Sequence, residues 1–555
     1  MSILRRLFGP EPANASGHLW PRWLFLRALG LIFFSAFYSL LFQIRGLIGP
    51  NGILPAGEYL VSVKAALGAK AYWFAPTLFW LSSGDRFMMA VCWAGLAASV
   101  LLILNIWPRG TIAICLVAYL SFVATSQVFG EYQSDGMLLA AGFLSLFLAP
   151  PGLRPGVVRA RAPSWASLFS LQWLWFQIYF ESGVVKIASH DPEWRSLTAL
   201  DHYYENGPLP DWIGWYAQQL PHQFHAGTAL FTLITEIGLV WMLFLPRRFK
   251  IICFFLVTPF QIGIILTANL AFLNYLVLSL GILLLDDRFM RGCYHRFIRL
   301  FQGWRAPSAG ASSGSESSTA QTGAVGESPA SLAGRSKDEE TGWQRTWQLA
   351  TLLFPAFMLT WNFYVATAQL LLMFAPSLPL PSSPITVLEP FRIANSYGLF
   401  AVMTTERREI EFQGSRDGKT WTAYPFRYKP QDPSKPPRIH APYQPRFDWN
   451  LWFASLGDWR QNPWVARAEL PLLRNDSSVL QLFSGNPFAD NPPLQVRTVT
   501  WKYWFTDLQT KRQTGLWWQR QFLGLFGPTL EREPNGDIDI VEEPGTQGIS
   551  PIPEQ

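Results

Sequence analysis

Long apolar runs constrain this chain more than any other feature. A helix needs about 20 mostly apolar residues to cross the hydrocarbon layer of a bilayer. Half of the residues are hydrophobic and only 15% are charged, whereas soluble domains carry about a quarter of charged residues. The sequence therefore predicts an α-helical polytopic membrane protein with about nine transmembrane helices. The predicted spans are 23–42, 87–106, 111–130, 136–150, 165–181, 227–245, 250–266, 270–285 and 346–375.

Clusters of Arg and Lys predict the orientation of these spans. With nine spans, four basic clusters fall on one side of the membrane, which the positive-inside rule assigns to the cytoplasm. The N-terminal residues 1–22 are then cytoplasmic, and the chain beyond the last span is lumenal or periplasmic. The clusters are Arg5, Arg6 and Arg22; Arg154, Arg159 and Arg161; Arg247, Arg248 and Lys250; and Arg288, Arg291, Arg296, Arg299 and Arg305.

Composition shifts divide the chain further. Residues 23–305 read as the multi-pass domain, and 306–342 are rich in Ser, Gly, Ala and Glu. Such a segment buries too little apolar surface to fold, so we expect a disordered cytoplasmic linker. Residues 343–375 hold the last transmembrane helix, 385–530 a separate domain, and the acidic, proline-rich 531–555 a flexible tail.

The C-terminal segment shows the pattern of a β-rich soluble domain. Apolar and polar residues alternate through 409–413 and again through 498–505, which is the period of a strand. Asp417-Gly418 is a turn signal that leads into a second strand through Trp421. The stretch 447–456 suits a short amphipathic helix. We therefore expect a β-rich domain with some helix on the extracytoplasmic side.

The polar stretch 181–226 separates the fifth and sixth spans and is predicted to be an extracytoplasmic loop. Lys186 stands at its beginning, and Glu236 lies in the middle of the next span. Charged groups in a bilayer are costly and usually mark a functional or a paired structural site. Lys186 could act as a base with Glu236 as proton partner, or it could be an interfacial lysine paired with Glu181 or Asp191. Amide side chains in other spans, such as Gln172 and Gln261, are expected to form interhelical hydrogen bonds.

Known chemical motifs are absent from the sequence. The four histidines of the 181–226 loop lack metal-ligand spacing, and the four cysteines form no CxxC pair. The sequence contains no GxSxG, P-loop or dinucleotide fingerprint. We therefore expect no metal, no cofactor and no nucleic acid partner, and the sequence favours a role other than catalysis.

Several blocks of this sequence resemble the lipase maturation factor family. In the loop, SGVVK, W-x-x-LTAL, HYYE, PLP and W-x-x-Q-LP follow the family's order, at 182–186, 194–200, 202–205, 208–210 and 215–221. Asn206-Gly207 stand where the family usually shows Thr-Gln. The segments GLIGPNGILPAGEYL (46–60), NSYGLFAVMTTERREIEFQGSRDG (395–418) and APYQPRFDWNLWFASL (441–456) also match.

This resemblance implies a multi-pass membrane protein that assists the maturation of secreted lipases or other exported clients. Family members of vertebrates lie in the endoplasmic reticulum, and a prokaryotic chain would lie in the inner membrane. We expect the client to contact side chains of the loop and of the C-terminal domain, unless the tryptophans only anchor the protein at the membrane interface. The candidates are Trp194, His202, Tyr204, Glu205, Trp212, Trp215, Tyr216, Trp449 and Trp452.

A weaker resemblance suggests an alternative. Vitamin K-dependent γ-carboxylases carry an essential lysine after a similar small-residue turn, and Lys186 falls at that place. It implies a quinone-linked membrane enzyme with Lys186 as base and Glu236 as proton partner.

Overall fold

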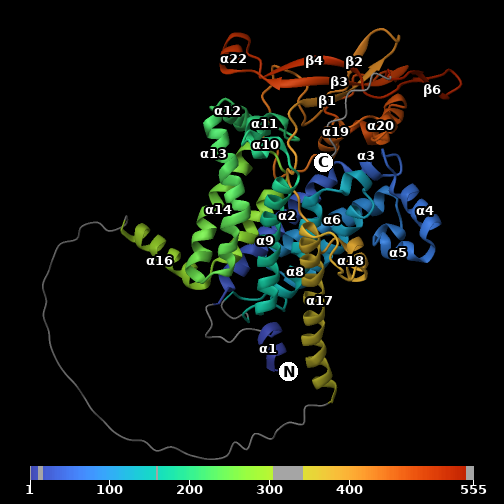
Figure 1. The fold of residues 1–555 in the computed structure, drawn as a ribbon. Helices are drawn as coiled ribbons and strands as arrows, with labels where there is room; N and C mark the ends of the chain where they lie inside the picture. The colour runs from blue at the N-terminus through green and yellow to red at the C-terminus, as the bar shows by residue number, and fades with distance from the viewer. Residues whose placement is uncertain (1, 10–16, 158–160, 304–341, 546–555) are drawn as a thin grey trace, which may run out of the picture.

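The computed structural model describes residues 2–9, 17–157, 161–303 and 342–545. A bundle of helices carries an antiparallel sheet across one of its ends, and α1 (Ser2–Phe8) lies near the opposite end (Figure 1). The short helices α10 to α12 stand between the bundle and the sheet. The predicted linker 306–342 falls almost entirely on residues outside those described.

Five helices among the described residues are long and apolar enough to cross a membrane, by length and composition. The first of them buries Phe25, Phe33 and Phe37, and the second packs against it, with Gly95 beside the Phe37 ring. Two of the five helices contain an internal proline, Pro259 in α14 and Pro355 in α17. The five are α2 (Leu19–Leu41), α6 (Asp85–Ile103), the continuous helix His222–Phe244, α14 (Arg247–Thr267) and the Leu349–Phe374 part of α17 (Gly342–Phe374).

The expected number of nine spans is therefore not supported. Each predicted span does coincide with a helix, but three of these helices have fewer than 18 residues, and α9 carries Glu181 and Lys186. Polar residues and short length lower the apolar character that a span requires. The four are α7 (Pro108–Val123), α8 (Gln133–Leu148), α9 (Trp165–Ala188) and α15 with its 3-10 extension (Leu273–Leu284).

Amide side chains join these helices, as the sequence predicts. Gln172 of α9 donates to Leu283 O at 2.8 Å, and Gln177 donates to Ala366 O of α17 at 2.8 Å. Asn274 of α15 donates to Gln261 of α14 at 2.8 Å. Such bonds are favourable where no water competes for the amide groups.

Shorter elements complete the helical part. The amphipathic α16 carries most of the last basic cluster, from Arg288 onward, and projects from the bundle (Figure 1). The others are α3 (Ile44–Ile48), α4 (Ala56–Leu67), η1 (Gly68–Lys70), α5 (Ala71–Phe74), η2 (Leu78–Trp80), η3 (Gln127–Gly130), α10 (Pro192–Arg195), α11 (Ala199–Asn206), α12 (Trp212–Gln218), α16 (Asp287–Gly303), α18 (Ser383–Leu388) and η7 (Glu389–Phe391).

The C-terminal domain contains a six-stranded antiparallel sheet with the order β2-β1-β3-β5-β6, and β4 pairs with β3 beside β5. Its longest strand, β3, pairs with β1 in the register Arg407 opposite Tyr503. The strands are β1 (Arg407–Ser415), β2 (Trp421–Ala423), β3 (Gln495–Phe505), β4 (Trp518–Leu525), β5 (Thr529–Arg532) and β6 (Ile538–Glu542).

The predicted strands and helix of this domain are confirmed. Asp417 accepts hydrogen bonds from the N–H groups of Lys419 and Thr420, and Gly418 takes a positive φ of 69° that closes the β1–β2 turn. The predicted helix 447–456 is α19 (Arg446–Ala454). The remaining helices are α20 (Pro463–Leu473), α21 (Ser477–Leu480) and α22 (Leu508–Thr514). The sheet continues through β5 and β6, into the region where the sequence suggests a flexible tail from residue 531.

Candidate functional site

The predicted loop 181–226 is shorter in the structure, because α9 continues through Ala188 and the next helix begins at His222. The segment between them folds into α10, α11 and α12 and is covered by the C-terminal domain. Arg407 of β1 donates to Glu205 O at 3.0 Å and to Pro208 O at 3.1 Å. Phe505 N donates to the Glu205 carboxylate at 2.7 Å, and burial raises the pKa of this carboxyl above its ordinary value. The loop and the β-rich domain therefore form one packed unit at the same end of the bundle.

Lys186 and Glu236 meet in a buried ion pair. The Lys186 Nζ lies 2.9 Å from Glu236 Oε2 and also donates to Leu399 O at 2.8 Å and to Ser182 O at 3.3 Å. The Trp194 ring lies 5.2 Å from the ammonium. A buried ion pair of this kind is stable only when its remaining hydrogen-bonding groups are also satisfied.

The sequence suggests that an interfacial Lys186 pairs with Glu181 or Asp191. The structure corrects this, because Lys186 pairs with Glu236. Glu181 instead accepts bonds from Gln177 at 3.0 Å and from Tyr397 N at 2.6 Å. Asp191 caps α10 and accepts a bond from Met403 N at 2.8 Å. The carboxylates of Glu181 and Asp191 therefore hold the C-terminal segment around Tyr397 and Met403 against α9 and the start of α10.

Glu236 occupies a special backbone position. The helix that begins at His222 changes to a π-helical turn, η4 (Ile234–Gly238), and continues as the 3-10 turn η5 (Leu239–Phe244). A π turn widens a helix by one residue and often occurs at functional sites. The π turn packs directly on Gly183 of α9. The contact is so close that a Cβ added at Gly183 would lie 2.9 Å from Glu236 Cβ. Close approach of the two helices thus places the carboxylate beside Lys186.

An elongated, mostly apolar cavity of about 370 Å³ opens beside this ion pair. Its walls come from α9, α11, the His222–Phe244 helix, α14 and α15. Volumes of about 300–1,000 Å³ are typical of small-molecule sites. Lys186 and Glu236 are its charged lining residues among those described, and Ser182, Gln261 and Asn274 are polar ones. We name this space the membrane cavity.

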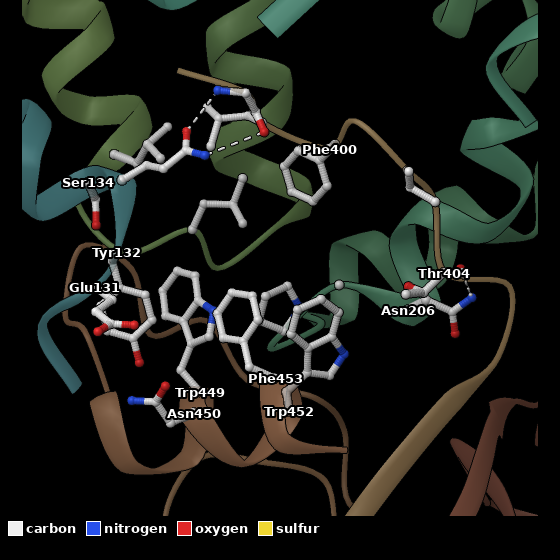
Figure 2. Close-up of a pocket in the computed structure, with 18 of the residues that line it drawn as sticks. Glu131, Tyr132, Ser134, Asn206, Phe400, Thr404, Trp449, Asn450, Trp452 and Phe453 are labelled. Atoms are coloured by element: carbon white, nitrogen blue, oxygen red, sulfur yellow. Dashed lines mark hydrogen bonds between the residues drawn. The ribbon is translucent and has the colours of Figure 1, made fainter. Parts of the chain in front are cut away.

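A second cavity of about 440 Å³ lies between the bundle and the C-terminal domain (Figure 2). Trp449, Trp452 and Phe453 of α19 form one wall, and Tyr132 and Ser134 face them from the start of α8. Tyr203, Leu399 and Phe400 line this space as well as the membrane cavity, and Phe400 holds a positive φ of 55°. We name this space the interdomain cavity.

Most of the predicted client-contact residues are buried. Trp215 is fully buried and donates its indole N–H to Trp517 O at 3.2 Å. Exposed contact positions are therefore wrong for Trp215, Trp449 and Trp452. The C-terminal domain covers Trp215, whereas Trp449 and Trp452 belong to that domain and face the bundle across the interdomain cavity, with Trp449 5.5 Å from the Tyr132 ring. Trp194 and Tyr204 are buried too, whereas Trp212 is 44% exposed.

The histidines of the loop serve local contacts. His202 lies 3.6 Å from the Glu193 carboxylate, and His222 lies 2.8 Å from Asp201. His225 is buried with its Nε2 2.9 Å from Leu220 O. Within the described ranges, no group of three His, Cys, Asp or Glu side chains is placed to hold a metal ion.

A second buried ion pair, which was not predicted from the sequence, links the bundle to the C-terminal domain. Arg446 of α19 forms two bonds to Asp135 of α8, at 2.7 and 2.9 Å, and further bonds to Tyr119 and to Phe129 O. Asp135 and Arg446 are separated by 311 positions in sequence. The charged Asp135 in an apolar segment was the signal that could have found it.

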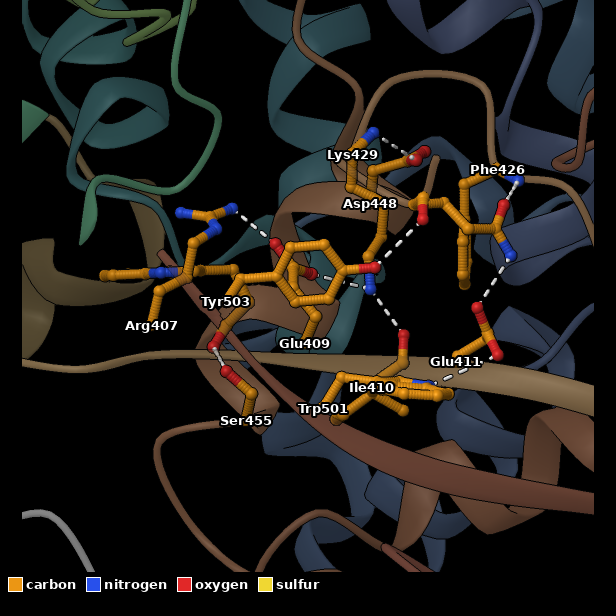
Figure 3. Close-up of polar contacts among 12 residues, drawn as sticks. Arg407, Glu409, Ile410, Glu411, Phe426, Lys429, Asp448, Ser455, Trp501 and Tyr503 are labelled. Carbon is orange, nitrogen blue, oxygen red and sulfur yellow. Dashed lines mark hydrogen bonds and ion pairs between the residues drawn. The ribbon is translucent and has the colours of Figure 1, made fainter. Parts of the chain in front are cut away.

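A second buried network supports the loop from inside the β-rich domain (Figure 3). Glu409 pairs with Arg407 at 2.5 Å and with Lys429 at 2.7 Å, and Lys429 also donates to Ile410 O. Glu411 accepts a bond from Trp501 at 3.3 Å. The Arg407 guanidinium thus bonds β1 to backbone carbonyls of the loop. The Glu409 carboxylate balances its positive charge.

The fold and the site define a membrane protein with several candidate spans, whose β-rich C-terminal domain is docked on the segment between α9 and the His222–Phe244 helix. The family model described as lipase maturation factor transmembrane domain matches residues 20–292, and that of the lipase maturation factor C-terminal domain matches 393–528. The chain belongs to the lipase maturation factor family.

Curated relatives match over nearly their whole length. Lipase maturation factor 2 of Gallus gallus is 32% identical over 92% of this chain and 81% of that protein. Lipase maturation factor 1 of Bos taurus is 30% identical over 95% of this chain and 92% of its own length. Lipase maturation factor 2 of Homo sapiens is 31% identical over 97% and 86%, respectively. No solved structure matches the chain.

Proposed function

We propose that this protein is a membrane-embedded maturation factor that assists the folding and assembly of exported proteins, with secreted lipases as clients. The observation that carries the proposal is the match of both family models and of relatives named lipase maturation factors across nearly the whole chain. The membrane is that of the endoplasmic reticulum, or the inner membrane if the chain is prokaryotic.

The positions of the basic loops support the proposed topology. Arg22 donates to Arg161 O at 2.8 Å, and Arg247 pairs with Asp286. Asp287 accepts bonds from the N–H groups of Leu19 and Trp20. Four basic segments therefore meet at the end of the bundle that lies opposite the sheet (Figure 1). A cytoplasmic location of this end obeys the positive-inside rule and puts the loop and the β-rich domain in the lumen or periplasm.

The exposed face of α12 is the client-contact surface that the structure supports best. Trp212 and Tyr216 are 44% and 49% exposed, and their ring centroids lie 6.4 Å apart. Partly buried Trp517 lies beside Tyr216 at 6.2 Å, and Lys511 covers Trp517 at 3.8 Å. Aromatic residues with a nearby cation are typical of binding hot spots. The buried candidates, by contrast, act by holding the loop in shape.

A secretion assay tests this function. Cells without maturation activity receive a secreted lipase together with this chain, and the lipase activity in the medium is divided by the lipase protein made. The wild type should raise this ratio. The double variant Trp212→Ala/Tyr216→Ala should lower it about 30-fold or more, because loss of a hot spot costs about 2 kcal/mol or more.

The control is Trp93→Ala, which removes an exposed tryptophan from the membrane helix α6. It should behave as the wild type. A wild type that leaves the ratio unchanged would refute the maturation role for that client. A double variant that only reduces the amount of chain in the membrane would instead assign the two rings to interfacial anchoring.

The structure does not favour the alternative of a quinone-linked enzyme. A catalytic base must offer a free lone pair. The Lys186 ammonium is directed at the Glu236 carboxylate and at two backbone carbonyls. This arrangement suits a structural ion pair that anchors Leu399 of the C-terminal segment to α9.

A further inference from the structure

The membrane cavity reaches the outer surface of the bundle. Phe224 and Phe231 of the His222–Phe244 helix and Gly263 of α14 line the cavity and are also exposed. An added Cβ at Gly263 would meet no atom within 4 Å. Both helices are among the five candidate spans. The opening between them therefore faces the hydrocarbon layer, so the natural source of an occupant is the bilayer.

Several polar groups around the cavity offer free hydrogen-bond acceptor positions. The hydroxyls of Ser182, Thr228 and Thr232 donate to carbonyls of their own helices, at 2.6, 2.8 and 2.9 Å, and so leave oxygen lone pairs free. Buried Asn274 donates its amide to Gln261, and its Oδ1 has no hydrogen-bond partner. Because a buried acceptor without a partner is costly, a ligand that donates would be favoured here.

The charge of the site limits the ligand further. Lys186 and Glu236 neutralise each other, and the lysine is already bonded to four oxygen atoms of the protein. A carboxylate or phosphate would bring a second anion toward Glu236 and the acceptor oxygens, which is unfavourable in a medium of low dielectric constant. An uncharged ligand with a hydroxyl donor avoids this repulsion.

We propose that the membrane cavity binds an uncharged membrane lipid with a free hydroxyl group. The hydroxyl donates to Asn274 Oδ1 or to the Glu236 carboxylate, and the hydrocarbon part lies against Phe260, Ile264 and Leu273 and leaves between Phe231 and Gly263. Acylglycerols and sterols share this chemistry. The proposal is independent of the client, since the cavity opens between two candidate membrane spans.

Photocrosslinking of the purified full-length chain tests this site. The protein is placed in phosphatidylcholine nanodiscs with a monoacylglycerol that carries a photoactivatable group in its acyl chain, and the labelled peptides are mapped by mass spectrometry. Label should concentrate on α9, α14 and the His222–Phe244 helix. Unlabelled monoacylglycerol should compete, whereas the fatty acid and its methyl ester, which lacks the hydroxyl, should not. A sterol arm distinguishes the two natural sources.

Two variants sharpen the test. Gly263→Trp narrows the opening, and Gly227→Trp is its matched control, because Gly227 is an exposed helix glycine that does not line the cavity and whose added Cβ also meets no atom. Asn274→Leu removes the unpartnered acceptor at nearly constant volume. Gly263→Trp and Asn274→Leu should each reduce specific labelling about tenfold, the effect of losing one buried hydrogen bond or its access.

Three outcomes would overturn the proposal. Label could be spread evenly over the lipid-facing helices, the methyl ester could compete as well as the monoacylglycerol, or Gly263→Trp could label as Gly227→Trp does. Thermal unfolding of each variant identifies one that fails to fold, in which case the competition by the methyl ester in the wild type still decides. Lipase secretion is a separate readout, so failure of the lipid site leaves the maturation role standing.

Discussion

Glu469 shows how a single buried residue in this protein responds to its surroundings. It lies on α20 beneath β3, fully buried, and accepts one hydrogen bond from Thr498 Oγ1 at 2.8 Å. Its second carboxylate oxygen has no partner. Burial raises the pKa of this carboxyl well above its ordinary value, because the loss of hydration outweighs the bond from Thr498.

The substitution Glu469→Gln should therefore stabilise the protein at alkaline pH. A raised pKa means that the folded state holds the proton more tightly, so this contribution to stability is complete below the unfolded pKa of about 4.3 and is lost as the pH rises through the folded pKa. Gln resembles the protonated acid and removes the loss, by about 1–3 kcal/mol. Thermal unfolding in detergent between about pH 5 and pH 9 measures the effect.

The exposed Glu389→Gln is the control and should leave the pH dependence unchanged. If Glu469→Gln and the wild type lose stability in parallel as the pH rises, the carboxyl is not the group responsible.

The sequence identifies a site residue where a charged side chain stands in an apolar segment, because its burial is energetically costly. It does not identify the partner of that residue. Lys186 and Glu236 stand out in apolar surroundings, so the sequence identifies both as candidate site residues without showing that they are in contact. The distance of 50 positions between them, and the π turn that directs Glu236, depend on the packing of two helices. Trp215 and Trp449 look like surface aromatics in the sequence, and their burial depends on how the bundle and the C-terminal domain pack against each other.

Elements were predicted better than single contacts, because apolar runs and alternating patterns are local signals. The chain divides between α14 and α15 where Thr267-Ala268-Asn269 interrupts one long apolar run. The number of membrane crossings was less certain, because helices such as α8 are buried by protein on all sides and need not reach both surfaces. The strands β5 and β6 lie in an acidic, proline-rich sequence that masks its pairing with β3.

The cap of α12 allows a prediction at the scale of the element. Asp211 is fully buried and accepts a hydrogen bond from Gly214 N at 2.7 Å, while α12 approaches Thr267 O at the end of α14. Burial raises the pKa of Asp211 to about 6, because desolvation outweighs the bonds from the helix N–H groups. The stability that it contributes is therefore greatest below its unfolded pKa of about 3.9 and falls as the pH rises through about 6.

Asp211→Asn should keep the cap without the charge, so it should be more stable than the wild type above about pH 6 and equal to it in acid. Asp211→Ala should lose about 1 kcal/mol with the cap. Hydrogen exchange of the α12 amides measures both changes. Equal exchange in the Asn and Ala variants would exclude a capping role.

At the scale of the whole molecule, two extramembrane segments and the helix bundle are joined by buried polar contacts. Asn269, between α14 and α15, donates to Arg438 O at 2.8 Å and accepts from His440 N at 2.6 Å. Arg446 reaches Asp135 from the other side. These links are distributed along the interface, so the β-rich domain is fixed to the bundle at several points.

Arg446→Met should uncouple the two parts. Removing one partner of a buried ion pair leaves an uncompensated charge, which costs about 3–5 kcal/mol. We expect a lower unfolding temperature and faster proteolysis between residues 393 and 446. Arg460→Met is the control, because Arg460 forms an exposed pair with Glu543 at 3.8 Å and should change stability little. The double variant Asp135→Leu/Arg446→Met should recover part of the loss, and additive losses would argue against direct coupling of the two residues.

The anchoring of Leu399 to Lys186 has a consequence for the order in which the protein is made. Domains generally fold as the chain leaves the ribosome, from the N-terminus onward. The groups that complete the environment of Lys186, Glu181 and Asp191 come from Leu399, Tyr397 and Met403, which are synthesised more than 200 residues later. In the nascent bundle these three side chains therefore lack part of their hydrogen-bond partners until residues 397–403 have been made. A stop codon before residue 393 would remove the β-rich domain. It would also remove the hydrogen-bond partners that Leu399, Tyr397 and Met403 supply to the helix bundle.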